Sequence, residues 1–114
     1  MECVNYTMEG RFLRLILMFD LPVETSKNRR DYRTFIKYLK TNGYLRLQYS
    51  VYSKLVMNRN VLKFHESKLQ LNVPPNGKVQ TMVITENQYV AMKYLVGEPS
   101  IDEQTLTTDR ILEL

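Results

Sequence analysis

The sequence is poor in the residues that build cross-links and metal sites, with one cysteine, one histidine and no tryptophan. Cys3 cannot form a disulfide within the chain, which suits a reducing cytoplasm, and Cys3 with His65 cannot supply the four ligands of a structural zinc site. No apolar run approaches the roughly 18 residues that span a membrane. The N-terminal residues lack the basic and apolar regions of a secretory signal. Disulfide scaffolds, zinc fingers and membrane proteins are therefore excluded.

The motifs of several enzyme classes are also missing. The sequence has no P-loop, no G-x-G-x-x-G, no G-x-S-x-G and no H-E-x-x-H. The predicted strand around residues 79–83 carries no aromatic side chain, which argues against an RNA recognition module. His65 is expected on the apolar face of a helix, where a structural role is favoured over a catalytic one.

Charge is present but unevenly distributed along the 114 residues, which carry a formal net charge of +4. Residues 1–10 contain two acids and no base, and residues 97–114 have a net charge of −4. Residues 11–96 therefore carry +10. A body of this charge favours a polyanionic partner, through phosphate neutralisation and counterion release. A solubilising surface with an acidic tail remains the alternative.

The hydrophobic pattern predicts one domain with the order β-α-β-α-β-α and a further strand at the C-terminus. The predicted β segment over residues 44–56 is long enough to serve two positions in a sheet, although it contains no hairpin signal. The predicted elements are a strand over 11–20 that stops at Leu21-Pro22; a helix from Thr25 or Ser26 to Asn42-Gly43; a β segment over 44–56; a helix from Asn58 that ends before Pro74-Pro75-Asn76-Gly77; a strand over 78–85; a short helix from Thr85 to about Leu95; and a terminal strand over 110–114.

This order predicts an α+β, ferredoxin-like sandwich with a mainly antiparallel sheet and helices on one face. A flavodoxin-like parallel sheet is the competing fold, but it would need another strand. We divide the chain into an N-terminal extension (1–10), the ferredoxin-like domain (11–96) and an acidic C-terminal segment with a terminal strand (97–114).

The first predicted helix separates an apolar stripe from a row of bases. On a helical wheel the bases fall within about 80° of arc, away from the apolar residues. We predict that this row faces solvent and contacts phosphates, with further basic residues on the strands as the next candidates. The row consists of Arg29, Arg33, Lys37 and Lys40, and the further candidates are Arg14, Arg46 and Lys78.

Asp20 ends the first predicted strand, where a buried element meets solvent. A carboxylate at this position can hold Mg²⁺, or it can simply organise the turn before Leu21-Pro22. A metal-dependent nuclease needs two or more anionic ligands, and only Glu24 lies near in sequence. A symmetric dimer would supply the second ligand by bringing two copies of Asp20 together.

Four segments in order resemble the family of CRISPR-associated protein two, the small subunit of the spacer-acquisition machinery. They are residues 15–22 (LILMFDLP), the basic helix that ends Tyr38-Leu39-Lys40 before Gly43, residues 46–52 (RLQYSVY) and the strand after the second helix. The sequence is most similar to the version found beside RNA-guided, single-protein effector nucleases. The resemblance covers about residues 12–96, and the ten residues before Arg11 depart from it.

The resemblance implies a ferredoxin-like homodimer that bridges two dimers of the CRISPR integrase, with double-stranded prespacer DNA across it. Some members of the family are metal-dependent nucleases on RNA or duplex DNA, and their strand-end aspartate corresponds to Asp20. We expect a non-catalytic, cytoplasmic DNA-bridging subunit, with a Mg²⁺-dependent endonuclease using paired Asp20 as the alternative. The terminal strand over 110–114 is expected to pair with a partner's sheet edge or with its own sheet.

Overall fold

A computed structural model describes residues 12–99, which form one four-stranded antiparallel sheet with three helices. The strand order is β2-β3-β1-β4, so β1 is central and β2 and β4 are the edges. This is the β-α-β-β-α-β arrangement of a ferredoxin-like sandwich, and it confirms the predicted fold class. The elements are β1 (Leu13–Asp20), α2 (Ser26–Thr41), β2 (Leu45–Gln48), β3 (Val51–Val56), α3 (Arg59–Gln70), β4 (Lys78–Thr85) and α4 (Glu86–Val90).

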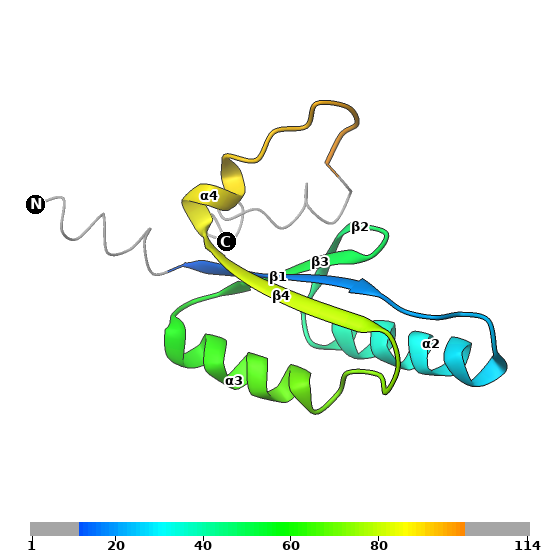
Figure 1. Ribbon diagram of the computed structural model, residues 1–114. Helices are drawn as coiled ribbons and strands as arrows, with labels where there is room; N and C mark the ends of the chain where they lie inside the picture. The colour runs from blue at the N-terminus through cyan, green and yellow to red at the C-terminus, as the bar shows by residue number, and fades with distance from the viewer. Residues whose placement is uncertain (1–11, 100–114) are drawn as a thin grey trace, which may run out of the picture.

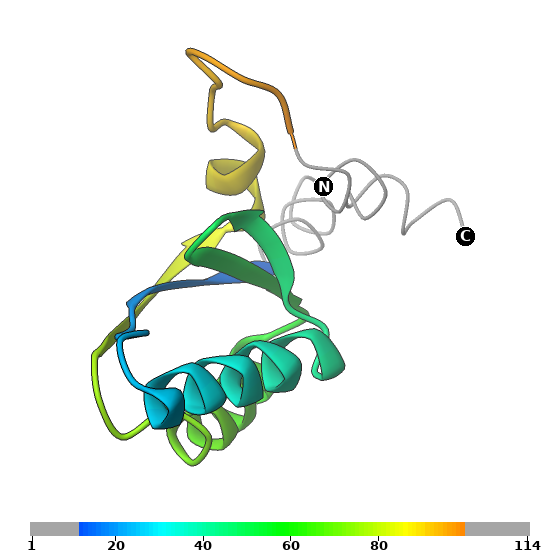
Figure 2. The ribbon, with the colours of Figure 1, turned by 90° about the vertical axis from the view of Figure 1, so that its right-hand side faces the viewer.

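The two long helices, α2 and α3, lie side by side on one face of the sheet (Figures 1 and 2). Alternate residues of β1, from Leu13 to Phe19, point toward them and form the core with Phe35, Leu39 and Leu62. The intervening residues of β1 point to the opposite face, which we call the open face. The short α4 lies on the open-face side (Figure 1), so the prediction of helices on one face holds for the long helices only.

The ends of α2 follow local sequence signals. The Thr25 side chain accepts a hydrogen bond from the backbone amide of Asn28 at 3.0 Å, and Asn42 is the C-terminal cap. Gly43 follows with a φ of 84°, in the left-handed region that favours glycine. The predicted boundaries of this helix are therefore confirmed.

The structure divides the predicted β segment over 44–56 into two strands and ends the last predicted helix earlier than expected. The long β segment does serve two sheet positions, as β2 and β3, with a turn at Tyr49-Ser50 that lacks the usual glycine or asparagine. The helix that begins at the Thr85 capping box ends at Val90 rather than near Leu95. The residues after it, from Met92 to Val96, instead line a cavity over the open face. The predicted strand over 110–114 lies outside the described residues.

None of the helices within residues 12–99 has the length and apolar character needed to cross a membrane.

Candidate nucleic-acid interface and strand-end carboxylate

The solvent side of α2 presents a basic surface. Arg33, Lys37 and Lys40 are all exposed, and they line a shallow depression of about 340 Å³ with Tyr32 and Ile36. Within the described part of the chain, none of the three bases forms an ion pair. We call these three residues the α2 basic row. Their charges are therefore available to an anionic partner.

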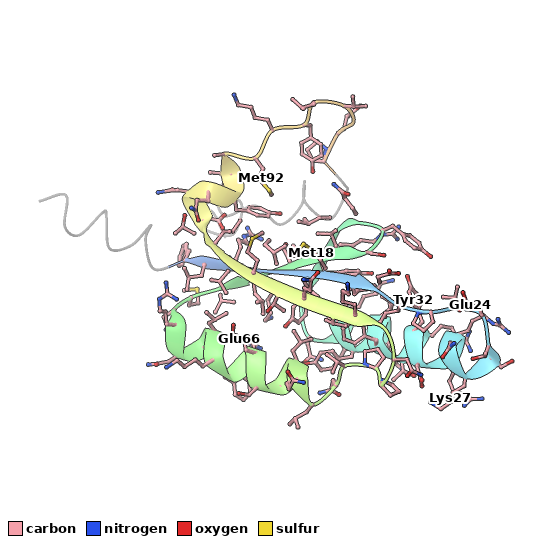
Figure 3. All side chains as sticks on the ribbon, in the orientation of Figure 1. Met18, Glu24, Lys27, Tyr32, Glu66 and Met92 are labelled. Carbon is pink, nitrogen blue, oxygen red and sulfur yellow. The ribbon has the colours of Figure 1, made fainter. Side chains whose placement is uncertain are left out.

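Arg29, the fourth predicted member of the row, is exposed but engaged within the protein. Its guanidinium donates hydrogen bonds to the backbone carbonyls of Val23 and Glu24 at 3.0 and 3.2 Å, and to Ser26 Oγ at 3.3 Å. It thereby ties the β1–α2 loop to the first turn of α2; Figure 3 labels Glu24 of this loop and Lys27 of this turn. A substitution of Arg29 would disturb this loop as well as any phosphate contact.

Arg14 is the one basic candidate that the structure rules out as a phosphate contact. Its side chain is 1% exposed, and its Nε donates to Glu86 Oε1 at 2.6 Å while Nη2 donates to Oε2 at 3.1 Å. The guanidinium also lies 4.1 Å from the ring centroid of Tyr89. The prediction was wrong because Arg14 is on the central strand, where α4 covers this end of the open face.

The remaining basic candidates, Arg46 and Lys78, are exposed but lie at different places. Arg46 is 5.4 Å from the ring centroid of Tyr49, which is hydrogen-bonded to Tyr32 of α2, so Arg46 lies near the α2 side of the sheet. Burial and this hydrogen bond raise the pKa of Tyr32 to about 12, which keeps its hydroxyl protonated near neutral pH. Lys78 begins β4 on the opposite face.

Asp20 is exposed at the end of β1, on the open face. It is the register partner of Lys78, so the two side chains emerge next to each other. The turn before Lys78 packs against it: a Cβ on Gly77, whose φ is 99°, would lie 2.8 Å from the carbonyl oxygen of Asp20. The strand-end position predicted from the sequence is thus confirmed, and the role of the carboxylate stays a prediction.

The described residues of one chain do not fit a Mg²⁺ site. Among residues 12–99, no group of three or more His, Cys, Asp or Glu side chains comes close enough to hold a metal ion. Asp20 instead has the ammonium-bearing Lys78 as its cross-strand neighbour. A metal would need a second carboxylate from outside residues 12–99 of this chain.

The open face between Asp20 and Arg14 is apolar. Ile16, Val51 and Met82 line a cavity of about 360 Å³ that residues 92–96 close from above. Figure 3 shows Met18 and Met92 on this side of the sheet, away from Glu66 of α3. Leu95 and Val96 are 93% and 92% exposed, so this region leaves much apolar surface in contact with water. The sequence analysis missed this surface, although the alternate apolar residues of β4 were a signal for it.

The matches to known proteins agree with these features. Residues 13–92 match the family model of CRISPR associated protein Cas2. The chain is 42% identical over 86 residues to the CRISPR-associated endoribonuclease Cas2 of Ligilactobacillus salivarius, covering 75% of this chain and 85% of that protein. It is 41% identical over 102 residues to the protein of the same name from Treponema denticola, covering 90% and 100%. The chain therefore belongs to the Cas2 family.

Proposed function

We propose that this protein is the dimeric DNA-bridging subunit of CRISPR spacer acquisition. In this role a homodimer supports double-stranded prespacer DNA and joins copies of the CRISPR integrase, in the cytoplasm. The observation that carries the proposal is the α2 basic row, in which three exposed bases lie along one helix and form no ion pair with any residue of the described range 12–99. Bases on a regular scaffold position a duplex through its backbone and do not read its sequence.

The length of the row suits a nucleic-acid backbone. From Arg33 to Lys40 the helix rises about 10 Å, which corresponds to about three base-pair steps of duplex DNA. A two-fold axis would double the row and present two such segments to one duplex.

The open face supports dimerisation through a second copy of the chain. It is apolar in the middle and carries Asp20 and Lys78 side by side at its rim, so a two-fold partner would meet both charges. Burying the exposed apolar residues around it would stabilise a pair of chains.

The dimer can be tested by placing a charge in the centre of the open face. We expect Met82→Glu to shift the protein from dimer to monomer in sedimentation experiments at micromolar concentration, because the two-fold would bury two unpaired carboxylates. Phe64→Glu, at an exposed apolar residue of α3, is the matched control and should remain dimeric. A Met82→Glu protein that sediments as a dimer would place the interface elsewhere.

A second candidate function is a metal-dependent endonuclease, on RNA or duplex DNA. Its supporting observation is the exposed Asp20 on the open face, since a partner stacked on this face brings a second carboxylate toward it. The relatives named above are called endoribonucleases. In this candidate function Mg²⁺ would lie between two protomers, because the described residues of one chain offer no group of three or more possible metal ligands.

Asp20→Asn separates the two functions, since asparagine keeps the size of the side chain and the turn but removes the charge. We expect this substitution to abolish any Mg²⁺-dependent nuclease activity of the isolated protein. Integration reconstituted with the integrase, and duplex binding, should change by less than about twofold. Glu24→Gln, at the exposed carboxylate nearest in sequence, is the control and should change neither activity.

The opposite results are equally informative. Nuclease activity that survives Asp20→Asn would remove Asp20 from the reaction. Loss of integration, in a variant that still folds and binds DNA, would favour catalysis over bridging.

A further inference from the structure

Two lysines from different elements meet at the C-terminal end of α2. Lys54, on β3, donates from Nζ to the backbone carbonyl of Asn42 at 2.7 Å. Lys68, on α3, donates from Nζ to Asn42 Oδ1 at 2.8 Å. Asn42 is the C-terminal cap of α2, so both ammonium groups lie where the basic helix ends. We call Asn42, Lys54 and Lys68 the cap cluster.

The geometry of the cap cluster is held by its neighbours. Asn42 Nδ2 donates to the carbonyl of Tyr38 at 2.8 Å, which orients Oδ1 toward Lys68. Gly43 has a φ of 84°, and a Cβ at this position would lie 2.8 Å from Lys54 Nζ. The positive φ favours glycine at this position, and the absence of a Cβ leaves room for the ammonium group of Lys54.

The cap cluster has more positive charge than its surroundings compensate. Among residues 12–99, neither lysine forms an ion pair, and the carbonyl end of α2 offers only partial negative charge. Burial and then the charge of Lys68 lower the pKa of Lys54. Burial and then the charges of both lysines lower the pKa of His65. Burial, and then Tyr38 and Glu66, raise the pKa of Tyr44. An anion placed here would relieve the repulsion between the two lysines.

We propose that the cap cluster is a phosphate-contact point for the backbone of a nucleic-acid duplex, and that it extends the α2 basic row onto α3. The inference rests on the proposed DNA-bridging function. Lys40 lies in the last turn of α2, two residues before Asn42, so the row and the cluster follow one another along the helix. Ammonium groups that are already held in place lose little conformational freedom when a phosphate binds. The duplex would thus pass from α2 toward α3.

The test measures how the affinity for a short, blunt-ended duplex of mixed sequence depends on NaCl between about 50 and 200 mM. We expect Lys68→Gln to lower the slope of log affinity against log salt by about two, one contact from each protomer of the dimer. Lys68→Arg, which keeps the charge, should restore most of the slope. Lys63→Gln removes the same charge from another exposed position of α3 and should leave the slope unchanged.

Thermal unfolding of each variant distinguishes binding from helix capping. A Lys68→Gln protein with a lower melting temperature and an unchanged slope would show that the lysine only caps α2, and would overturn the inference. If the slope falls after loss of the α2 basic row but not after Lys68→Gln, the cap cluster is excluded and the bridging function stands. If neither the Lys68→Gln variant nor the variant without the α2 basic row changes the slope, the cap cluster is excluded and the bridging function loses the basic row that supports it.

Discussion

Replacement of Arg33, Lys37 and Lys40 together by alanine should remove most of the affinity for duplex DNA and flatten its salt dependence. The proposed dimer would lose six phosphate contacts, and each contact contributes about 0.9 to the slope of log affinity against log salt, so the slope should fall by about five. The three side chains are exposed and form no ion pairs with the described residues, so the fold should be unaffected. Titration of a labelled duplex at several salt concentrations measures both effects.

A triple variant at Lys27, Arg59 and Lys63 is the matched control, because it removes the same charge from exposed positions outside the row. It should lower the affinity only slightly, through the weaker overall field. If the control and the row variant behave alike, DNA binding depends on net charge and not on the α2 basic row. An unchanged slope in both would move the DNA surface to Arg46 and Lys78.

The largest effect on stability should come from the buried pair of Arg14 and Glu86. Removal of one partner leaves an uncompensated charge in the interior, so Arg14→Met or Glu86→Leu should each lower the free energy of unfolding by about 3–5 kcal/mol. The double substitution should cost far less than the sum, because neither charge then remains buried. Urea unfolding at one fixed protein concentration measures the cycle, since association of the chains would add to the apparent stability.

The exposed pair of Lys27 and Asp31, one turn apart on α2, provides the comparison. The side chains are 64% and 28% exposed, and alanine at either position should change the free energy of unfolding by less than about 1 kcal/mol. Single substitutions at Arg14 and Glu86 with equally small and additive effects would show that the interior pair is solvated.

Local signals in the sequence were sufficient for most boundaries. The structure selects Thr25 from the two caps predicted for α2, Thr25 and Ser26, and it confirms that α3 starts at its cap Asn58 and that Thr85 begins a capping box. These signals are local because a cap depends on hydrogen bonds within a few residues. The helical wheel of residues 26–41 correctly predicted that Lys37 and Lys40 are exposed, because the apolar stripe on the other side of the helix faces the sheet. The position of Asp20 followed from the proline that stops β1.

Contacts between segments that are distant in sequence could not be predicted from these local signals. In the alternating pattern of the first strand, Arg14 occupies a position where an exposed base is expected. It is buried because α4 packs over the open face and brings Glu86, 72 residues away in sequence, next to it. The convergence of Lys54 and Lys68 on Asn42 likewise required three elements to pack together.

The sequence by itself determined the order of helices and strands, the basic side of α2 and the strand-end place of Asp20, because each depends on residue spacing along one element. The tertiary structure alone decided which charged side chains are exposed and which form contacts within the protein, because burial and pairing depend on elements that meet only in the folded chain. In the folded chain Arg14 forms a buried ion pair with Glu86, Arg29 donates hydrogen bonds to the loop before α2, and the α2 basic row is exposed to solvent.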